Sequence, residues 1–164
     1  MAFHDDLLEQ AHHLANREPK RPKQASLRRA VSSAYYALFH LLAWEVSRNW
    51  KRPAERVTLA RMLDHSPMKK VCTNKRDELN KHFGTNPPNN HALQVLKHLH
   101  TITDAFSQMQ EFRHTADYDG SYRWTRTDTL QKIDSVTAAF DSWKAIRHEH
   151  VAQDFLVTLL LKPR

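Results

Sequence analysis

The sequence predicts an all-α protein, an up-and-down bundle of four to five helices, from three observations. Only two of the 164 residues are glycine, although the tight turns between strands depend on glycine. Apolar residues recur at spacings of three and four, which is the period of an α-helix. The breaks between these runs are polar or contain proline. The length fits one domain over residues 1–164, with a core from about 3 to 148 and an apolar tail from 151 to 164.

Three helices are expected in the first part of the chain. The first covers about residues 3–16, and the segment REPKRPKQ, residues 17–24, ends it with two prolines. The second runs from about Ser26, whose hydroxyl suits an N-cap, to Trp50. A shorter helix is expected to begin at Pro53, because proline is favoured in the first helical turn.

The second half of the chain begins with a segment that is hard to assign. Within residues 65–91, HSPMKK and FGTNPPNN read as loops, and the residues between them suit a short helix. The clearest helix of the chain follows, and Gly120 is its expected C-terminal stop. A last helix is expected over about 126–148, because Thr125 and Asp128 have the spacing of a capping box.

The tail contains the run FLVTLLL, Phe155 to Leu161, which is too short for a membrane span and too apolar for a free end. We expect it to pack on the bundle or on a second subunit. The N-terminal MAFHDDLLEQ lacks the basic region of a signal peptide, and the lone Cys72 allows no internal disulfide. These features predict a cytoplasmic protein without membrane contact.

The charge of the chain bears on the kind of partner that it could bind. The chain has 25 Lys and Arg against 18 Asp and Glu, a formal net charge of +7. Positive charge favours RNA or nucleotides as partners, because it neutralises phosphates and steers polyanions. Many soluble domains are equally basic, so charge alone leaves an ordinary solvated surface equally open.

A polar stripe follows the second predicted helix, in the stretch RAVSSAYYALFH. At about 100° per residue its members fall opposite the apolar face. They are Arg29, Ser33, Tyr36 and His40. A solvated face is the commoner interpretation for a bundle helix. A site is the other, because the stripe carries a guanidinium, a phenol and an imidazole instead of the Glu and Lys of most exposed helices.

A second polar feature lies on the clearest helix. Arg113 falls at the centre of its apolar face, and Asp117 follows one turn later. An unpaired buried charge is costly, so Arg113 must meet a carboxylate or an anionic ligand. An Arg113–Asp117 ion pair and a ligand-facing role both satisfy this. We expect the two helices to be neighbours, with Arg113 near Tyr36 or near residues 117–119.

Two stretches, SLRRAVSSAYYALFH and RHTADYD, resemble the HEPN superfamily of prokaryotic helical domains. The similarity is closest to the branch with an R-x-x-A-D-Y-D ending, here Arg113, Ala116, Asp117, Tyr118 and Asp119. The resemblance implies a bundle of four to five helices that is frequently dimeric. It also implies a link to RNA cleavage or nucleotide handling in toxin, defence and stress systems.

The chain departs from the catalytic members of that superfamily. HEPN ribonucleases carry an Arg, four to six residues and then a His, and the matching positions here hold other residues: Tyr118, Asp119 and Gly120. The motif histidine is therefore missing. His114 and His40 are candidate substitutes, because an imidazole can move the 2′-hydroxyl proton while Arg113 stabilises charge on the phosphate.

Metal chemistry is the remaining class. Glu9 with His12, and Glu111 with His114, have the Glu-x-x-His spacing of di-metal four-helix bundles. Both glutamates point away from the apolar faces of their helices, whereas such ligands must project inward. We therefore predict no metal site and no cofactor.

Two functions remain. The first, favoured by the missing histidine, is a non-catalytic binding module in an RNA- or nucleotide-linked system, acting as a homodimer or with a nucleotidyltransferase-like or antitoxin partner. The second is a metal-independent ribonuclease or nucleotide-handling effector with Arg113, His114 and His40 as catalytic residues. The candidate ligand-binding residues are Arg29, Ser33, Tyr36, Asp117, Tyr118 and Asp119.

Overall fold

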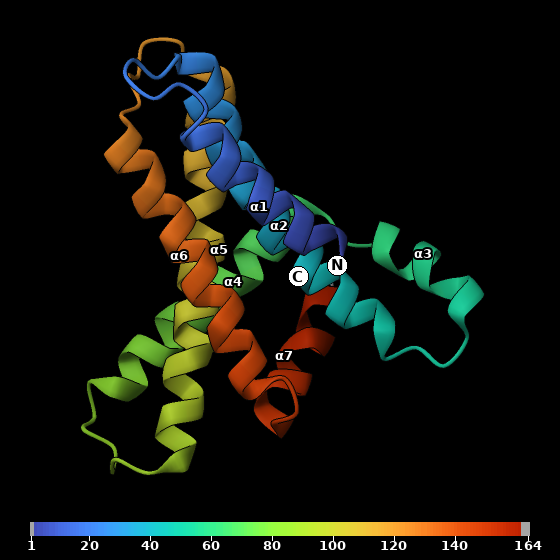
Figure 1. The fold of residues 1–164 in the computed structure, drawn as a ribbon. Coiled ribbons are helices and arrows are strands. Elements are labelled where there is room, and N and C mark those ends of the chain that lie inside the picture. Colours follow the sequence, from blue (N-terminus) through green and yellow to red (C-terminus); the bar gives the residue numbers. More distant parts are fainter. Residues whose placement is uncertain (1, 162–164) are drawn as a thin grey trace.

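The computed structural model describes residues 2–161, which form seven α-helices and no strand (Figure 1). The helices are α1 (Phe3–Ala15), α2 (Gln24–Arg48), α3 (Pro53–Arg61), α4 (His65–Phe83), α5 (His91–Tyr118), α6 (Arg126–Ile146) and α7 (His150–Leu160). The predicted all-helical class is confirmed. The predicted number of four to five helices is too low, because a long helix occupies the segment that was hard to assign and a short one occupies the tail.

The helix α2 is the centre of the fold. It contacts α1, α5, α6, α3 and α7, and the long helices run beside one another in Figure 1 while α3 extends away from them. Because neighbours surround it, α2 buries side chains around most of its circumference, including Leu27, Leu38 and Leu42 with no exposed surface. Each such leucine stabilises the fold by roughly 1.5–3 kcal/mol. The helix α5 is the second hub, since it also contacts α4 and α6.

The segment HSPMKK is not a loop but the start of α4. Pro67 is the third residue of this helix, where a missing N–H costs nothing because the first amides have no partner within the helix. Three buried side chains, those of Met68, Cys72 and Leu79, lie on α4, which packs against α5. The predicted loop that follows is confirmed over residues 84–90.

The predicted helix starts fared differently. Thr125 is the N-cap of α6, and its hydroxyl accepts a hydrogen bond from the N–H of Asp128 at 3.1 Å. Ser26 is not the N-cap of α2, which begins two residues earlier. Its hydroxyl instead donates to Glu18 Oε1 at 2.8 Å, so Ser26 holds the α1–α2 connection against α2.

The end of α5 does not depend on Gly120. The helix stops at Tyr118, and the described glycines have no left-handed backbone conformation. Asp119 closes the turn instead, since its Oδ1 accepts from the N–H of Ser121 at 2.9 Å and from the Ser121 hydroxyl at 2.6 Å. An Asx-type turn therefore ends the helix without glycine.

The apolar tail packs on the bundle as α7. Phe155, Leu156 and Leu159 are buried and belong to the same hydrophobic core as the long helices. The expectation of a packed tail is thus confirmed for α7, whereas Leu161 is 61% exposed and residues 162–164 lie outside the described part. Among residues 2–161, no helix combines the length and the apolar character that crossing a membrane requires.

Candidate functional site

The C-terminal half of α5 lies against α2 and brings Arg113 to two tyrosines. Arg113 Nη1 lies 3.7 Å from Asp117 Oδ2, and the two side chains are only 14% and 21% exposed. The guanidinium carbon is 5.3 Å from the ring centre of Tyr35 and 5.8 Å from that of Tyr36. These distances confirm the predicted neighbourhood and allow cation–π attraction from both rings.

The contacts of Arg113 leave some of its N–H donors without a hydrogen-bond partner among the described residues. Its Nε atom is buried and has no hydrogen-bond partner among the described residues. Asp117 Oδ2 also accepts a long hydrogen bond from the Ser32 hydroxyl at 3.5 Å. The ion pair thus lies at the contact of the two helices, and the buried Nε donor of Arg113 is unsatisfied.

The helix α4 adds a histidine to this junction. Tyr35 Oη and His65 Nδ1 share a hydrogen bond of 2.6 Å, and the imidazole stacks on Phe39 with ring centres 4.2 Å apart. Burial lowers the pKa of His65 from its ordinary 6.5, and the charges of Arg113 and His40 lower it further, against the raising effect of Asp64. His65 is therefore neutral at pH 7.

Burial also raises the pKa of the Tyr35 phenol, against a smaller lowering effect of Arg113. The phenol consequently remains protonated at pH 7. The Tyr35–His65 hydrogen bond thus joins two uncharged groups directly beside a cation.

A cleft of about 520 Å³ opens between the first turns of α4 and the C-terminal half of α5. We call it the Arg113 cleft, and its lining includes His65, Ser66, Lys69, Glu111, Arg113 and His114. Lys69 Nζ lies 2.9 Å from Glu111 Oε1, so this cation already has a carboxylate partner. The size of the cleft falls within the range of small-ligand sites.

The three candidate catalytic residues do not meet at one place. Arg113 and His114 line the same cleft, and the exposed His114 ring lies 5.0 Å from the ring of Tyr118. His40 lines a different concavity, where its ring is 4.9 Å from that of Phe3. The structure therefore groups one of the two predicted histidines with Arg113.

The polar stripe of α2 is not assembled around Arg113. Of its members only Tyr36 reaches the guanidinium. Arg29 is exposed, and the Ser33 hydroxyl donates to Gln10 Oε1 of α1 at 3.3 Å. The stripe is the less buried face of α2, but only Arg29 of the four is exposed, and Ser33, Tyr36 and His40 are half-buried.

Two residues of the R-x-x-A-D-Y-D ending also lie apart from Arg113. Tyr118 is 69% exposed. Asp119 accepts hydrogen bonds from Ser121, which lower the pKa of its carboxyl. Asp117 is thus the member of this ending that pairs with Arg113.

Several residues of the junction escaped the sequence analysis. Ser32 and Tyr35 stand beside predicted members of the stripe, and the SS and YY doublets were the signal available for them. His65 was hidden by the assignment of HSPMKK to a loop. Arg28 ties the end of α5 to α2, because it donates to the carbonyl of Ala116 at 2.8 Å and to that of Tyr122 at 2.6 Å.

The described residues do not form a metal site around the Glu-x-x-His pairs. Glu111, the glutamate of one Glu-x-x-His pair, binds Lys69. No group of three or more His, Cys, Asp or Glu within residues 2–161 is placed to hold a metal ion.

Comparisons with protein-family models, with curated proteins and with solved structures find no match to this chain.

Proposed function

We propose that this chain is a HEPN-like, non-catalytic binding module of an RNA- or nucleotide-linked toxin, defence or stress system, acting through a second copy or a partner protein. The observation that carries the proposal is the engagement of Arg113. An arginine that stabilises a transition state must present its donors to the developing charge. Arg113 is instead directed into the α2–α5 junction, where Asp117, Tyr35 and Tyr36 surround it.

The histidines support the same proposal. A general base must come within about 2.6–3.2 Å of the proton that it removes, while the arginine holds the phosphate. His114 lines the Arg113 cleft, but its ring lies against the exposed Tyr118, and His40 lines another concavity. Tyr118 occupies one of the positions where the catalytic motif has histidine.

The surface offered to a partner is the end of α5 with the loop that follows it. Tyr118 is 69% exposed and Tyr122 is 42% exposed, and His114 is exposed next to Tyr118. Aromatic side chains are enriched in protein interfaces. A second copy of the chain is the first partner to test, followed by a nucleotidyltransferase-like or antitoxin protein.

One observation favours the second candidate function, metal-independent RNA cleavage. His65 is a neutral imidazole that lines the same cleft as Arg113. Its Nδ1 is engaged by Tyr35, which leaves Nε2 for contact with a ligand. If the chain cleaves RNA, His65 is the residue that moves the proton.

A cleavage assay with chelator separates the two functions. We expect the wild type to leave single-stranded RNA uncut at rates indistinguishable from buffer, and Arg113→Ala to lower the melting temperature. RNA cleavage by the wild type that is lost in both Arg113→Ala and His65→Gln, with His148→Gln fully active as a matched exposed control, would establish the ribonuclease instead.

The binding role has its own measurement. We expect light scattering of the wild type to give the mass of a dimer, and Tyr118→Asp to shift it toward the monomer at unchanged melting temperature. Gln131→Asp, an exposed change on α6 outside this surface, is the matched control. A monomeric wild type that also fails to bind a co-expressed partner contradicts the module.

A further inference from the structure

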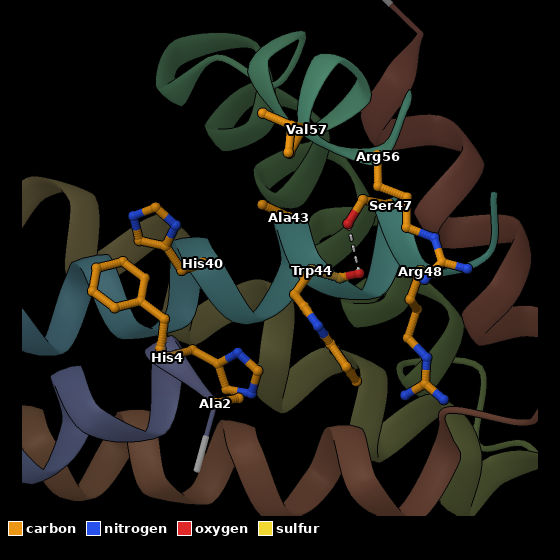
Figure 2. A pocket seen from close by; sticks show the side chains of 11 residues that line it. Ala2, His4, His40, Ala43, Trp44, Ser47, Arg48, Arg56 and Val57 are labelled. Carbon is orange, nitrogen blue, oxygen red and sulfur yellow. Dashed lines mark hydrogen bonds between the residues drawn. The ribbon is translucent and has the colours of Figure 1, made fainter. Parts of the chain in front are cut away.

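A second concavity, of about 690 Å³, lies between the start of α1, the C-terminal half of α2 and α3 (Figure 2). We call it the aromatic hollow, and its lining includes Phe3, His4, His40, Trp44, Arg48 and Arg56. The helix α3 forms one wall although none of its residues is buried. The hollow shares no lining residue with the Arg113 cleft.

Four aromatic rings form one part of the hollow. Phe3 is 60% exposed and Trp44 is 42% exposed, so both present apolar surface to the hollow and to solvent. The His40 ring stands 4.9 Å from that of Phe3, and the His4 ring stands 5.5 Å from that of Trp44. Burial lowers the pKa of both histidines, so these rings are uncharged at pH 7.

Two guanidinium groups form the other part. In Figure 2, His40 lies at one end of the hollow, and Arg48 and Arg56 lie at the opposite end. The guanidinium carbon of Arg48 is 4.4 Å from the ring centre of Trp44. Arg56 uses its Nε to donate to the carbonyl of Trp50 at 2.9 Å, and no hydrogen bond of its terminal nitrogens is found among the described residues.

The charge at this end is not neutralised. Among the described residues that line the hollow there is no carboxylate. Arg48 Nη1 lies 3.5 Å from Glu45 Oε1, but that buried carboxylate is also paired with Arg147 at 2.5 Å. Two guanidiniums thus share one carboxylate, and Arg56 adds a further positive charge.

We propose that the aromatic hollow binds a nucleotide, with the base against the rings and the phosphate at Arg48 and Arg56. Bases stack on aromatic side chains, and guanidiniums bind phosphate through paired donors. The volume lies within the range of small-ligand sites. A base joined to a phosphate is offered by a free mononucleotide and by single-stranded RNA. This inference goes beyond the proposed function, because it concerns a separate site.

Two neighbouring positions of α3 provide a matched pair of variants. Val57 lines the hollow and is 59% exposed, whereas the adjacent, exposed Thr58 does not line it. Val57→Glu places a carboxylate in the wall of the hollow, where it repels an anionic ligand, and Thr58→Glu makes the same charge change outside the hollow. Phe3→Ala is a second test, because it removes an exposed ring without adding charge.

The experiment is calorimetric titration of the full chain with AMP, adenosine, inorganic phosphate and single-stranded oligoadenylate. A purification tag belongs at the C-terminal end, because Ala2 lines the hollow. We expect AMP to bind more tightly than adenosine or phosphate. Val57→Glu and Phe3→Ala should each weaken AMP at least about tenfold, and Thr58→Glu less than about twofold.

The outcomes of the titration either support or overturn nucleotide binding in the hollow. Binding of oligoadenylate alone, with the same pattern among the variants, identifies RNA as the source of the nucleotide. Absence of binding to both AMP and oligoadenylate overturns the proposal. Equal weakening by Val57→Glu and Thr58→Glu, or phosphate binding as tight as AMP binding, also overturns it.

Discussion

The Arg113 cleft and the aromatic hollow contain similar residue types but differ in how their cations are partnered. In the cleft, Arg113 has Asp117 as its carboxylate, and Lys69 has Glu111. In the hollow, Arg48 shares a carboxylate with Arg147, and Arg56 has only a carbonyl partner. We therefore propose that the guanidinium beside aromatic rings stabilises the fold in the cleft and binds a ligand in the hollow.

If both proposals hold, residue type alone does not distinguish a structural arginine from a ligand-binding one. The two kinds of arginine differ in the number and charge of the groups that already contact the guanidinium. A cation with an internal carboxylate loses a partner when a ligand competes for it. A cation whose charge is not neutralised by a carboxylate gains a partner when an anionic ligand binds.

The largest effect should come from Arg113→Ala. Removing a largely buried cation orphans Asp117 and leaves space beside Tyr35, so the free energy of unfolding should fall by about 2 kcal/mol. For a chain of this size that lowers the melting temperature by roughly 4–8 °C. Arg29→Ala, at an exposed position of α2, should change stability by less than about 0.5 kcal/mol. Equal melting temperatures of the two variants would remove the structural role of Arg113.

The second-largest effect on stability should come from lowering the pH. Because burial lowers the pKa of His65 below 6.5 in the folded chain, the unfolded chain binds the proton first. Stability is then fully present above pH 6.5 and decreases as the pH falls below it, by at most about 1.4 kcal/mol per pH unit for this histidine. The measurement is the melting temperature at pH 7.5, 6.5 and 5.5.

His4 and His40, in the aromatic hollow, have lowered pKa values as well and act in the same direction. His65→Gln should therefore reduce the pH dependence without abolishing it. His148→Gln, at an exposed position, should leave it unchanged. A wild type that is as stable at pH 5.5 as at pH 7.5 contradicts this prediction.

A smaller effect is expected from Tyr35→Phe. The change removes the hydrogen bond to His65 while the buried ring stays in place, and should cost about 1 kcal/mol. Tyr36→Phe is the matched control, because no hydrogen bond of its hydroxyl is found among the described residues, and should cost less than about 0.5 kcal/mol. If Tyr36→Phe proves the more harmful change, the hydrogen bond between Tyr35 and His65 does not stabilise the fold as predicted.

The smallest effect on stability should come from Arg56→Gln in the aromatic hollow. Its one hydrogen bond is exposed, so chemical denaturation should show a change below about 0.5 kcal/mol. The same variant should weaken AMP binding clearly, because a phosphate partner is lost. Strong destabilisation would place Arg56 with Arg113 as a structural arginine.

Much of the fold was predictable from local pattern. Apolar spacing located α5 and α6, and the first-turn proline located α3 at Pro53. The same reasoning failed for α4, because the loop-like composition of HSPMKK predicts a loop although Pro67 lies in a first turn, where proline is tolerated. It also failed at Gly120, since an aspartate turn ends α5 instead.

The site was only half predictable, for a geometric reason. The proximity of Arg113 to Asp117 and Tyr36 follows from helical spacing and from the cost of a buried charge. The side chains that complete the junction, Tyr35 and His65, depend on where α4 packs, which no local pattern states. Each residue along a helix is rotated by about 100° from the one before. A residue next to a predicted polar position, such as Tyr35 beside Tyr36, therefore falls outside the predicted polar face.

The most direct test of the contrast between the two sites is a double-mutant cycle on Arg113 and Asp117. The stabilities of the wild type, Arg113→Ala, Asp117→Ala and the double variant are measured by chemical denaturation. We predict a coupling energy of about 1 kcal/mol, as expected for a partly buried pair in contact. A coupling energy below about 0.3 kcal/mol would show that Asp117 does not hold Arg113, and would leave its guanidinium as available to a ligand as those of the aromatic hollow.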